Sequence, residues 1–363
     1  EIPLRLVGSE MCIRDSCLYI QYIIELMQYS ELHCITNFTF LRGASHPYEL
    51  VNTASKLGYK ALAITDECSL SGIVKAHVAA SKKNLQLIIG SEFKIESHKI
   101  IILVTNRDSY SKLSSLITLA RRRSKKGKYQ IRWSDLKFNN DGLLILWIPC
   151  GNLTRDTLIA SQLHEWFDQR LWIAFHNLLN GNETCRLSYL QNLSISWKIQ
   201  IVACGDIHMH RKNRQLLQDT LTAIREGCSL MELGKFRYPN CERYLRKINY
   251  LKEIYPSELI NETTKISRLC RFSLNELHYE YPSEVIPKNL TSKEYLHFLV
   301  NNGARKRWPS GVSKKITNQI NYELSVINEL NYESYFLTVY DLSLIHISEP
   351  TRRRGISYAV FCL

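Results

Sequence analysis

The sequence lacks several patterns by which common protein classes are recognised. It has no apolar run approaching the roughly 18 residues that a membrane span needs. Its 11 cysteines are scattered and form no CxxC pair, which argues against a disulfide framework and indicates free thiols in a reducing compartment. It contains no Gly-x-Ser-x-Gly elbow, no Walker loop and no Gly-x-Gly-x-x-Gly, so serine hydrolases and nucleotide-fold dehydrogenases are poor interpretations. These absences favour a soluble, cytoplasmic protein.

Acidic residues are also scarce relative to basic ones. The 363 residues include 47 Lys and Arg but only 34 Asp and Glu, which gives a net charge of +13 and a pI near 9.2. This balance favours a polyanionic partner, with nucleic acid ahead of a membrane surface. The alternative is a basic but otherwise ordinary surface. The length is sufficient for about two domains.

The stretch 29–93 predicts alternating strands and helices. A helix is expected after Ser45 or His46, because Pro47 suits its first turn and Gly58 follows its last apolar residue. The apolar runs 61–65 and 85–89 are typical of buried parallel strands. The order is therefore β-α-β-α-β, with polar groups where the strands stop.

Further strands are predicted downstream. They cover residues 100–104, 143–148, 171–175 and 200–204, and helical segments separate most of them. A β/α barrel or a doubly wound sheet over 29–240 follows from this alternation. From residue 242 onward the chain is mostly helical and charged in pattern, and apolar residues at helical spacing predict a packed helix over 316–330.

Acidic and imidazole side chains stand at or near the ends of the predicted strands. They are His33, Asp66, Glu67, Glu92, Asp206 and His208. The carboxyl ends of strands carry the chemistry of α/β sheets and barrels, and such side chains ligate metal ions. In an extended segment Asp206 and His208 point the same way and can reach one ion. Taken singly, each residue has a structural explanation, as a helix cap or a hydrogen-bonded histidine.

A dense run of cations closes a predicted helix over 110–123. Its members are Arg121, Arg122, Arg123, Lys125, Lys126 and Lys128. Such a run can bind the phosphates of DNA. The alternative is a solvated helix end whose cations favour the macrodipole.

The residues resemble a known family. YSELHCITNFTFLRGASHPYELVNTASKLGYKALAITDECSLSGIVKAHVAA (29–80) is similar to the PHP domain that opens bacterial C-family DNA polymerases, above all the error-prone relatives of the polymerase III alpha subunit. IILVTNRDSYSKLSSLITLARRRSKKGKY (101–129), GDIHMHRKNRQLLQDTLTAIREG (205–227) and ELNYESYFLTVYDL (329–342) match in the same order. The resemblance implies a distorted β/α barrel over 29–240 and the start of a polymerase palm over 241–342.

The two ends do not continue this resemblance. Residues 1–16 and 343–363 resemble translated sequencing-adapter DNA and are set apart as tails. The family implies error-prone, damage-tolerant DNA synthesis from deoxynucleoside triphosphates, with two Mg²⁺ held by palm aspartates. Those aspartates are expected beyond residue 342, so no catalytic residue is assigned here and the chain by itself is expected to be inactive as a polymerase. DNA and other replication or damage-response proteins are the implied partners.

The metal site that the resemblance implies is incomplete. Active members open with His-x-His, whereas this chain has His33 followed by Ile35. Arg42 stands where an Asp is expected, and Glu67 stands where a His is expected. We therefore predict weak binding of Zn²⁺ or Mn²⁺, or none, and no robust phosphoesterase activity. Two alternatives remain open: a stand-alone PHP metal-dependent phosphoesterase, and a non-catalytic DNA-binding scaffold.

Overall fold

The computed structural model describes residues 28–137, 140–277, 286–287 and 289–348. The predicted tail 1–16 lies outside the described residues, and so does most of the predicted tail 343–363. The chain forms two units, Glu1–Leu277 and His278–Leu363.

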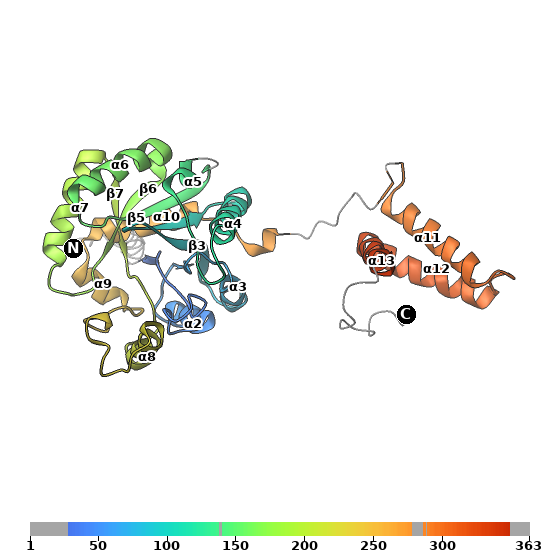
Figure 1. Ribbon diagram of the computed structural model, residues 1–363, viewed down its shortest axis with the longest axis horizontal. Helices are drawn as coiled ribbons and strands as arrows, with labels where there is room; N and C mark the ends of the chain where they lie inside the picture. Colours follow the sequence, from blue (N-terminus) through green and yellow to red (C-terminus); the bar gives the residue numbers. More distant parts are fainter. Residues whose placement is uncertain (1–27, 138–139, 278–285, 288, 349–363) are drawn as a thin grey trace, which may run out of the picture. The chain divides into compact units, whose positions relative to one another are not determined.

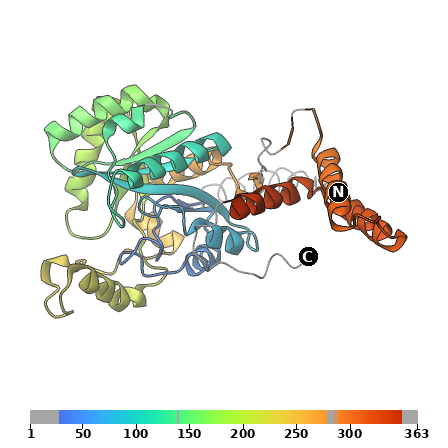
Figure 2. The ribbon, with the colours of Figure 1, turned by 45° about the vertical axis from the view of Figure 1, so that its right-hand side comes forward.

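The described part of the first unit is built on a seven-stranded sheet in which the strands follow chain order, from β1 to β7. Helices α2 to α7 surround this sheet in both views (Figure 1, Figure 2). The strands are β1 (Ser30–Glu31), β2 (Ala61–Ile64), β3 (Gln86–Ile95), β4 (His98–Val104), β5 (Leu143–Ile148), β6 (Leu171–His176) and β7 (Gln200–Cys204). The helices are α2 (Pro47–Lys56), α3 (Ile73–Ala80), α4 (Arg107–Arg122), α5 (Trp133–Lys137), α6 (Leu153–Phe167), α7 (Glu183–Trp197), α8 (Gln215–Glu226), α9 (Ile248–Ile254) and α10 (Ser257–Leu269).

The predicted start of helix α2 is confirmed. His46 is its N-cap residue and Pro47 its first residue, and Glu49 accepts a hydrogen bond from the main-chain N–H of His46 at 2.9 Å. Gly58 follows the helix with φ +77°, a conformation that side chains other than glycine rarely adopt. The chain then enters β2, in which all four residues are buried, as expected of a strand covered on both faces.

Strand β4 departs from the predicted alternation of strands and helices. It is antiparallel to both β3 and β5, whereas the other neighbouring pairs are parallel. Only Glu96 and Ser97 separate β3 from β4, and Glu96 has φ +55°. A parallel crossover needs a dozen or more residues, so this tight turn can only reverse the chain.

The sheet closes almost completely into a barrel. Beyond the ends of β1 and β7, Cys34 and Ile207 form a parallel bridge, and the N–H of Ile35 donates to the carbonyl of Ile207 at 2.9 Å. The buried carboxylate of Glu31 also joins the two strands, because it accepts from the N–H of Gly205 at 2.9 Å. The distorted β/α barrel predicted from the sequence is confirmed.

Helix α10 extends the first unit beyond the boundary at residue 240 that the sequence suggested. Ile266 and Cys270 join the inner cluster of apolar side chains inside the barrel. The indole N–H of Trp172 on β6 donates to Glu262 Oε1 at 3.0 Å. The unit therefore continues to Leu277, because residues 257–270 bury a face against the sheet although their overall composition is charged.

The second unit contains helices α11 (Ser292–Arg307), α12 (Lys314–Glu329) and α13 (Glu333–Ser348). Leu296, Leu324 and Leu337, one from each helix, form its buried cluster. The helix predicted over 316–330 corresponds to α12. Helix α13 continues to Ser348 and so includes the first residues of the predicted tail 343–363. Among the described helices, none has the length and apolar character that crossing a bilayer requires.

Candidate functional site

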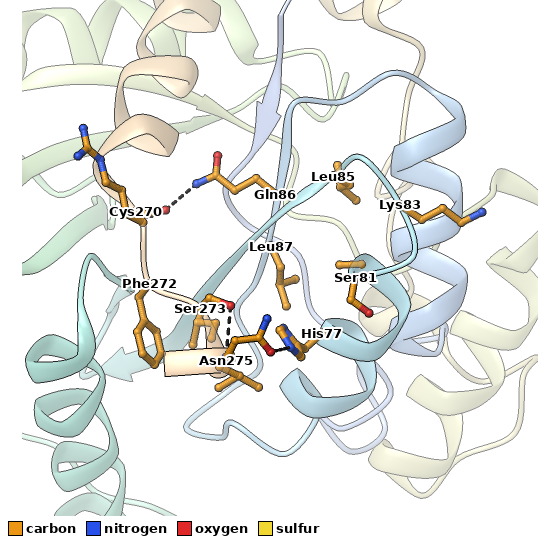
Figure 3. A pocket seen from close by; sticks show the side chains of 14 residues that line it. His77, Ser81, Lys83, Leu85, Gln86, Leu87, Cys270, Phe272, Ser273 and Asn275 are labelled. Carbon is orange, nitrogen blue, oxygen red and sulfur yellow. Dashed lines mark hydrogen bonds between the residues drawn. The ribbon is translucent and has the colours of Figure 1, made fainter. Parts of the chain in front are cut away.

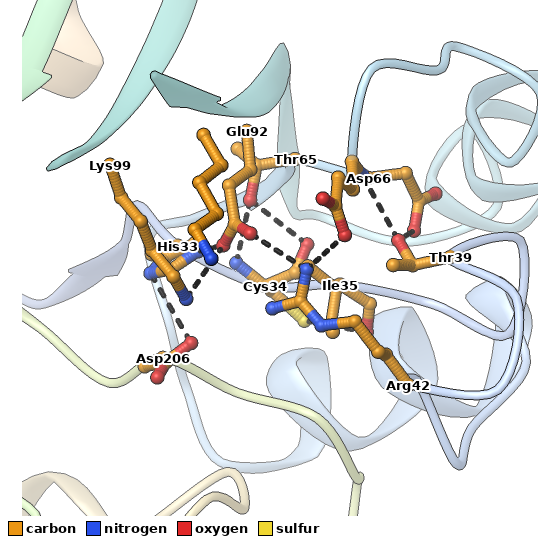
Figure 4. A network of polar contacts seen from close by, with 12 residues as sticks. His33, Cys34, Ile35, Thr39, Arg42, Thr65, Asp66, Glu92, Lys99 and Asp206 are labelled. Carbon is orange, nitrogen blue, oxygen red and sulfur yellow. Dashed lines mark hydrogen bonds and ion pairs between the residues drawn. The ribbon is translucent and has the colours of Figure 1, made fainter. Parts of the chain in front are cut away.

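Three of the predicted site residues meet at the carboxyl edge of the barrel. Nε2 of His33 lies 2.8 Å from Glu92 Oε2, and Nδ1 of His33 lies 3.5 Å from Asp206 Oδ1. All three side chains are buried, and one ligand atom from each lies within 4.8 Å of the others, close enough to hold one metal ion (Figure 4). We call these three residues, together with His176 and His208, the barrel centre.

His208 and His176 complete the imidazole set. Nε2 of His208 lies 3.2 Å from Asp206 Oδ1, so the two side chains meet, although Asp206 has φ +49° and not the extended conformation on which the prediction relied. Nε2 of His176 lies 3.1 Å from Nδ1 of His33. We assign neutral tautomers in which His33 donates to Glu92 and accepts from His176. His176 was not among the predicted site residues, although its place at the end of β6 carried the same strand-end signal.

Three cations contact the carboxylates of the barrel centre. Nη1 of Arg42 lies 2.8 Å from Glu92 Oε1 and also pairs with Glu67. Nζ of Lys99 lies 3.7 Å from Glu92 Oε2. The guanidinium of Arg243 pairs with Asp206. Sequence reasoning singled out Arg42 but missed Lys99 and Arg243.

The charges of these groups balance without a metal ion. Arg42, Lys99 and Arg243 supply three positive charges against three negative charges on Glu67, Glu92 and Asp206. Burial by itself raises the pKa of Glu92, but Lys99 and Arg42 outweigh it and hold that pKa well below its usual range. Burial lowers the pKa of Arg243 to about 10, which keeps this side chain cationic at neutral pH.

The imidazoles of the barrel centre are neutral. Burial lowers the pKa of His33, and it holds the pKa of His176 and of His208 well below the usual range. A fully buried Ile35 stands where the family has a second histidine ligand. A multi-metal cluster needs carboxylates that are not already neutralised, so the residues present do not fit one.

Asp66, another predicted ligand, organises the loop that carries Arg42. Its carboxylate accepts from the N–H of Thr36 at 2.7 Å, from Oγ1 of Thr36 at 2.9 Å and from Oγ1 of Thr39 at 2.6 Å. Gly43 closes the same loop so tightly that a Cβ placed there would lie 2.0 Å from the carbonyl oxygen of Thr36. The loop therefore holds Arg42 in a fixed position.

The cations predicted to bind DNA divide into two groups. Arg121 donates to the carbonyls of Glu67 and Cys68 at 3.1–3.2 Å, so its guanidinium serves the loop after β2. Arg123 is bound to Asp135. The other four side chains are exposed: Arg122, Lys125, Lys126 and Lys128. We call these four residues the basic segment.

A pocket at the opposite edge of the sheet does not resemble a reaction site. It lies between the end of α3, the start of β3 and residues 270–275 (Figure 3). The amide of Gln86 is committed to the carbonyls of Ser267 and Cys270, at 2.8 and 2.6 Å. His77 lies 3.0 Å from Asn275 Oδ1 on the exposed rim.

The barrel with its strand-end imidazoles and carboxylates has the form of a PHP domain. Residues 31–169 match the PHP domain family, and residues 294–351 match the family described as the bacterial DNA polymerase III alpha NTPase domain. Among solved structures, an amidohydrolase from Chromobacterium violaceum has a TM-score of 0.39 at 14% identity, over 50% of this chain and 87% of that one.

The similarity to full-length relatives extends over most of the chain. This chain is 45% identical over 330 residues to the error-prone DNA polymerase of Methylococcus capsulatus. The matched region is 90% of this chain and 31% of that protein. This chain is 46% identical over 315 residues to the error-prone DNA polymerase of Pseudomonas fluorescens, which covers 86% of this chain and 30% of that protein. The chain is similar to these bacterial error-prone DNA polymerases and spans about a third of their length.

Proposed function

We propose that this chain supplies the PHP part of an error-prone DNA-directed DNA polymerase that acts in damage-tolerant DNA synthesis, and that its barrel centre is a structural brace without phosphoesterase activity. The observation that carries the second part is the set of three cations, Arg42, Lys99 and Arg243, against the buried carboxylates. A buried charge must be paired, and here protein cations supply the pairing that metal ions would otherwise give.

We propose that the whole protein has the activity for which its relatives are named. Template-directed synthesis would use DNA, deoxynucleoside triphosphates and Mg²⁺, and other replication or damage-response proteins would be partners. The free cysteines of the described residues agree with a cytoplasmic location. In the barrel centre Zn²⁺ or Mn²⁺ would have to displace cations, so we expect binding there to be weak or absent.

Measurements of metal content and of phosphate release test whether the barrel centre is structural and without phosphoesterase activity. The purified chain should carry less than one equivalent of tightly held Zn²⁺ or Mn²⁺ at the barrel centre. This amount is measured as the metal that is lost when Asp206 is substituted. The chain should release no phosphate from nucleotides or DNA 3′ ends above the level of the variant Asp206→Asn. Two or more equivalents lost in that variant, together with metal-dependent phosphate release, would establish the stand-alone phosphoesterase instead.

The basic segment gives the brace a second role, in holding DNA. Arg122, Lys125, Lys126 and Lys128 are exposed at the end of α4, so their charges are available to phosphates. Arg121 and Arg123 have partners within the protein and are excluded from this role. We propose that these four cations contact the DNA backbone without reading its sequence.

A further inference from the structure

A second group of metal-ligating side chains lies apart from the barrel centre. His98 begins β4, Cys150 lies in the loop after β5, and Asp156 is in the first turn of α6. One ligand atom from each lies within 4.8 Å of the other two. His98 and Asp156 are buried and Cys150 is half-buried, so the group is enclosed but open to solvent on its cysteine side.

The protein fixes the carboxylate of Asp156 in a single orientation. Oδ1 accepts from the N–H of Cys150 at 2.9 Å, and Oδ2 accepts from the N–H of Gly151 at 2.8 Å and from the hydroxyl of Tyr189 at 2.5 Å. A carboxylate offers about four lone-pair sites, and these bonds use three of them. The remaining one, on Oδ1, is on the atom that lies 3.4 Å from Nδ1 of His98.

His98 also presents a lone pair to this group. The indole N–H of Trp147 donates to Nδ1 of His98 at 3.3 Å, so Nδ1 carries no proton. Two acceptor atoms, Nδ1 of His98 and Oδ1 of Asp156, therefore stand 3.4 Å apart with no proton between them. A cation shared by the two atoms would turn this repulsion into attraction.

We propose that His98, Cys150 and Asp156 bind one divalent transition-metal ion of the Zn²⁺ class. Nitrogen, sulfur and oxygen donors suit this class, and a water molecule reaching the half-buried Cys150 would complete a tetrahedron. Zinc bonds to nitrogen and oxygen of about 2.0–2.1 Å place tetrahedral neighbours about 3.3–3.4 Å apart, which is the separation of His98 Nδ1 and Asp156 Oδ1. The long hydrogen bond from the indole N–H of Trp147 to Nδ1 of His98 would be replaced by the coordinate bond to the metal ion.

The ion would act as a structural clip. His98 begins β4, Cys150 follows β5 and Asp156 belongs to α6, so a bond to each would tie the end of this strand pair to helix α6. Among the described residues no Lys or Arg forms an ion pair with Asp156, whereas Arg42, Lys99 and Arg243 pair with the carboxylates of the barrel centre. The proposal does not depend on the function proposed above.

Cobalt titration of the metal-free, full-length chain tests the proposal. We expect one equivalent of Co²⁺ to produce a thiolate-to-metal charge-transfer band, because only a cysteine ligand gives this transition. The band should disappear in Cys150→Ser and persist in Cys185→Ser, a matched change at an exposed free cysteine. In His98→Gln the affinity for Co²⁺ should fall at least tenfold, and circular dichroism checks that each variant is folded.

Two results would overturn the proposal. One is the absence of a charge-transfer band in the unmodified chain at Co²⁺ concentrations above those of the protein. The other is a band that survives in Cys150→Ser, because the ion would then be held by another thiol. A band that is lost in Cys150→Ser and kept in Asp206→Asn supports the site and also separates it from the barrel centre.

Discussion

Replacing Arg42 by alanine tests the brace most directly. Nη1 of Arg42 lies 2.8 Å from Glu92 Oε1, and the same group pairs with Glu67. The side chain of Glu92 is 0% exposed, so water cannot take over the lost interaction. In Arg42→Ala this carboxylate keeps His33 at 2.8 Å and Lys99 at 3.7 Å. Three carboxylates would then face two cations.

The expected cost follows from burial. Removing one partner of a buried ion pair typically costs about 3–5 kcal/mol, because the other charge is left without compensation. The side chains of Arg42 and Glu67 are 16% and 24% exposed, so solvent screens part of this interaction. We therefore expect a loss of about 3 kcal/mol in the free energy of unfolding. At roughly 2–4 °C per kcal/mol, the Tm of the first unit should fall by roughly 6–12 °C.

Thermal and urea unfolding followed by circular dichroism measure this loss. Arg122→Ala is the matched control, because it removes an exposed arginine and should change stability by less than about 0.5 kcal/mol. A loss below about 1 kcal/mol in Arg42→Ala would refute the reasoning, since Glu92 would then not depend on this cation. In Arg42→Asp, Zn²⁺ or Mn²⁺ should raise the Tm by several degrees more than in the unmodified chain, because a carboxylate replaces the cation.

Three further predictions concern DNA binding, pH and backbone packing. The double variant Lys125→Ala/Lys126→Ala should weaken the binding of duplex DNA, as measured by fluorescence anisotropy. The slope of log K against log [KCl] should become shallower by about 2, because two phosphate contacts are lost. An unchanged slope would exclude phosphate contacts at these lysines. The histidines of the barrel centre have lowered pKa values in the folded state, so their contribution is fully present above about pH 6.5 and is lost as the pH falls through the folded-state values. Each should remove up to about 1.4 kcal/mol per pH unit in urea titrations below pH 6.5. Burial raises the pKa of Glu31 and Asp66, which opposes this slope in part, but stability that rises from pH 6.5 to pH 5 would contradict the assignment of neutral imidazoles. Gly43→Ala should cost at least about 2 kcal/mol, because its Cβ would meet a main-chain carbonyl at 2.0 Å, and a stability near that of the unmodified chain in urea unfolding would show that this loop is not rigid.

The sequence allowed site residues to be predicted where they lie at or near the end of a predicted strand. His33, Glu92 and Asp206 lie at or near strand ends, and the parallel strands of a barrel bring such positions to one edge. The same logic could not reveal Lys99, because the direction of β4 depends on the two-residue turn before it. Arg243 was equally hidden, since it lies in an irregular segment that a main-chain bond from the N–H of His208 to its carbonyl, 3.0 Å long, brings to the site.

Composition does not reveal that the first unit continues to Leu277, for a related reason. The segment after residue 240 is rich in charged residues, yet α10 directs Ile266 into the barrel and the N–H of Ser30 donates to Oγ1 of Thr263 at 3.2 Å. A helix needs only one apolar stripe to join a core, so average polarity over such a segment does not mark a boundary. Composition likewise hid the division among the cations near the end of α4. Neighbouring arginines differ in role because Arg121 faces the carbonyls after β2 whereas Arg122 faces solvent.

In the barrel centre, buried acidic residues are paired with cations of the protein itself. Each buried carboxylate needs a counter-charge, because the burial of an unpaired charge is costly. Glu92 has two such cations and Asp206 has one. Substituting either carboxylate now would leave its cations unpaired in turn, at a cost similar to that of removing a cation. Acidic residues at this site therefore contribute to stability, and their presence does not by itself indicate catalysis.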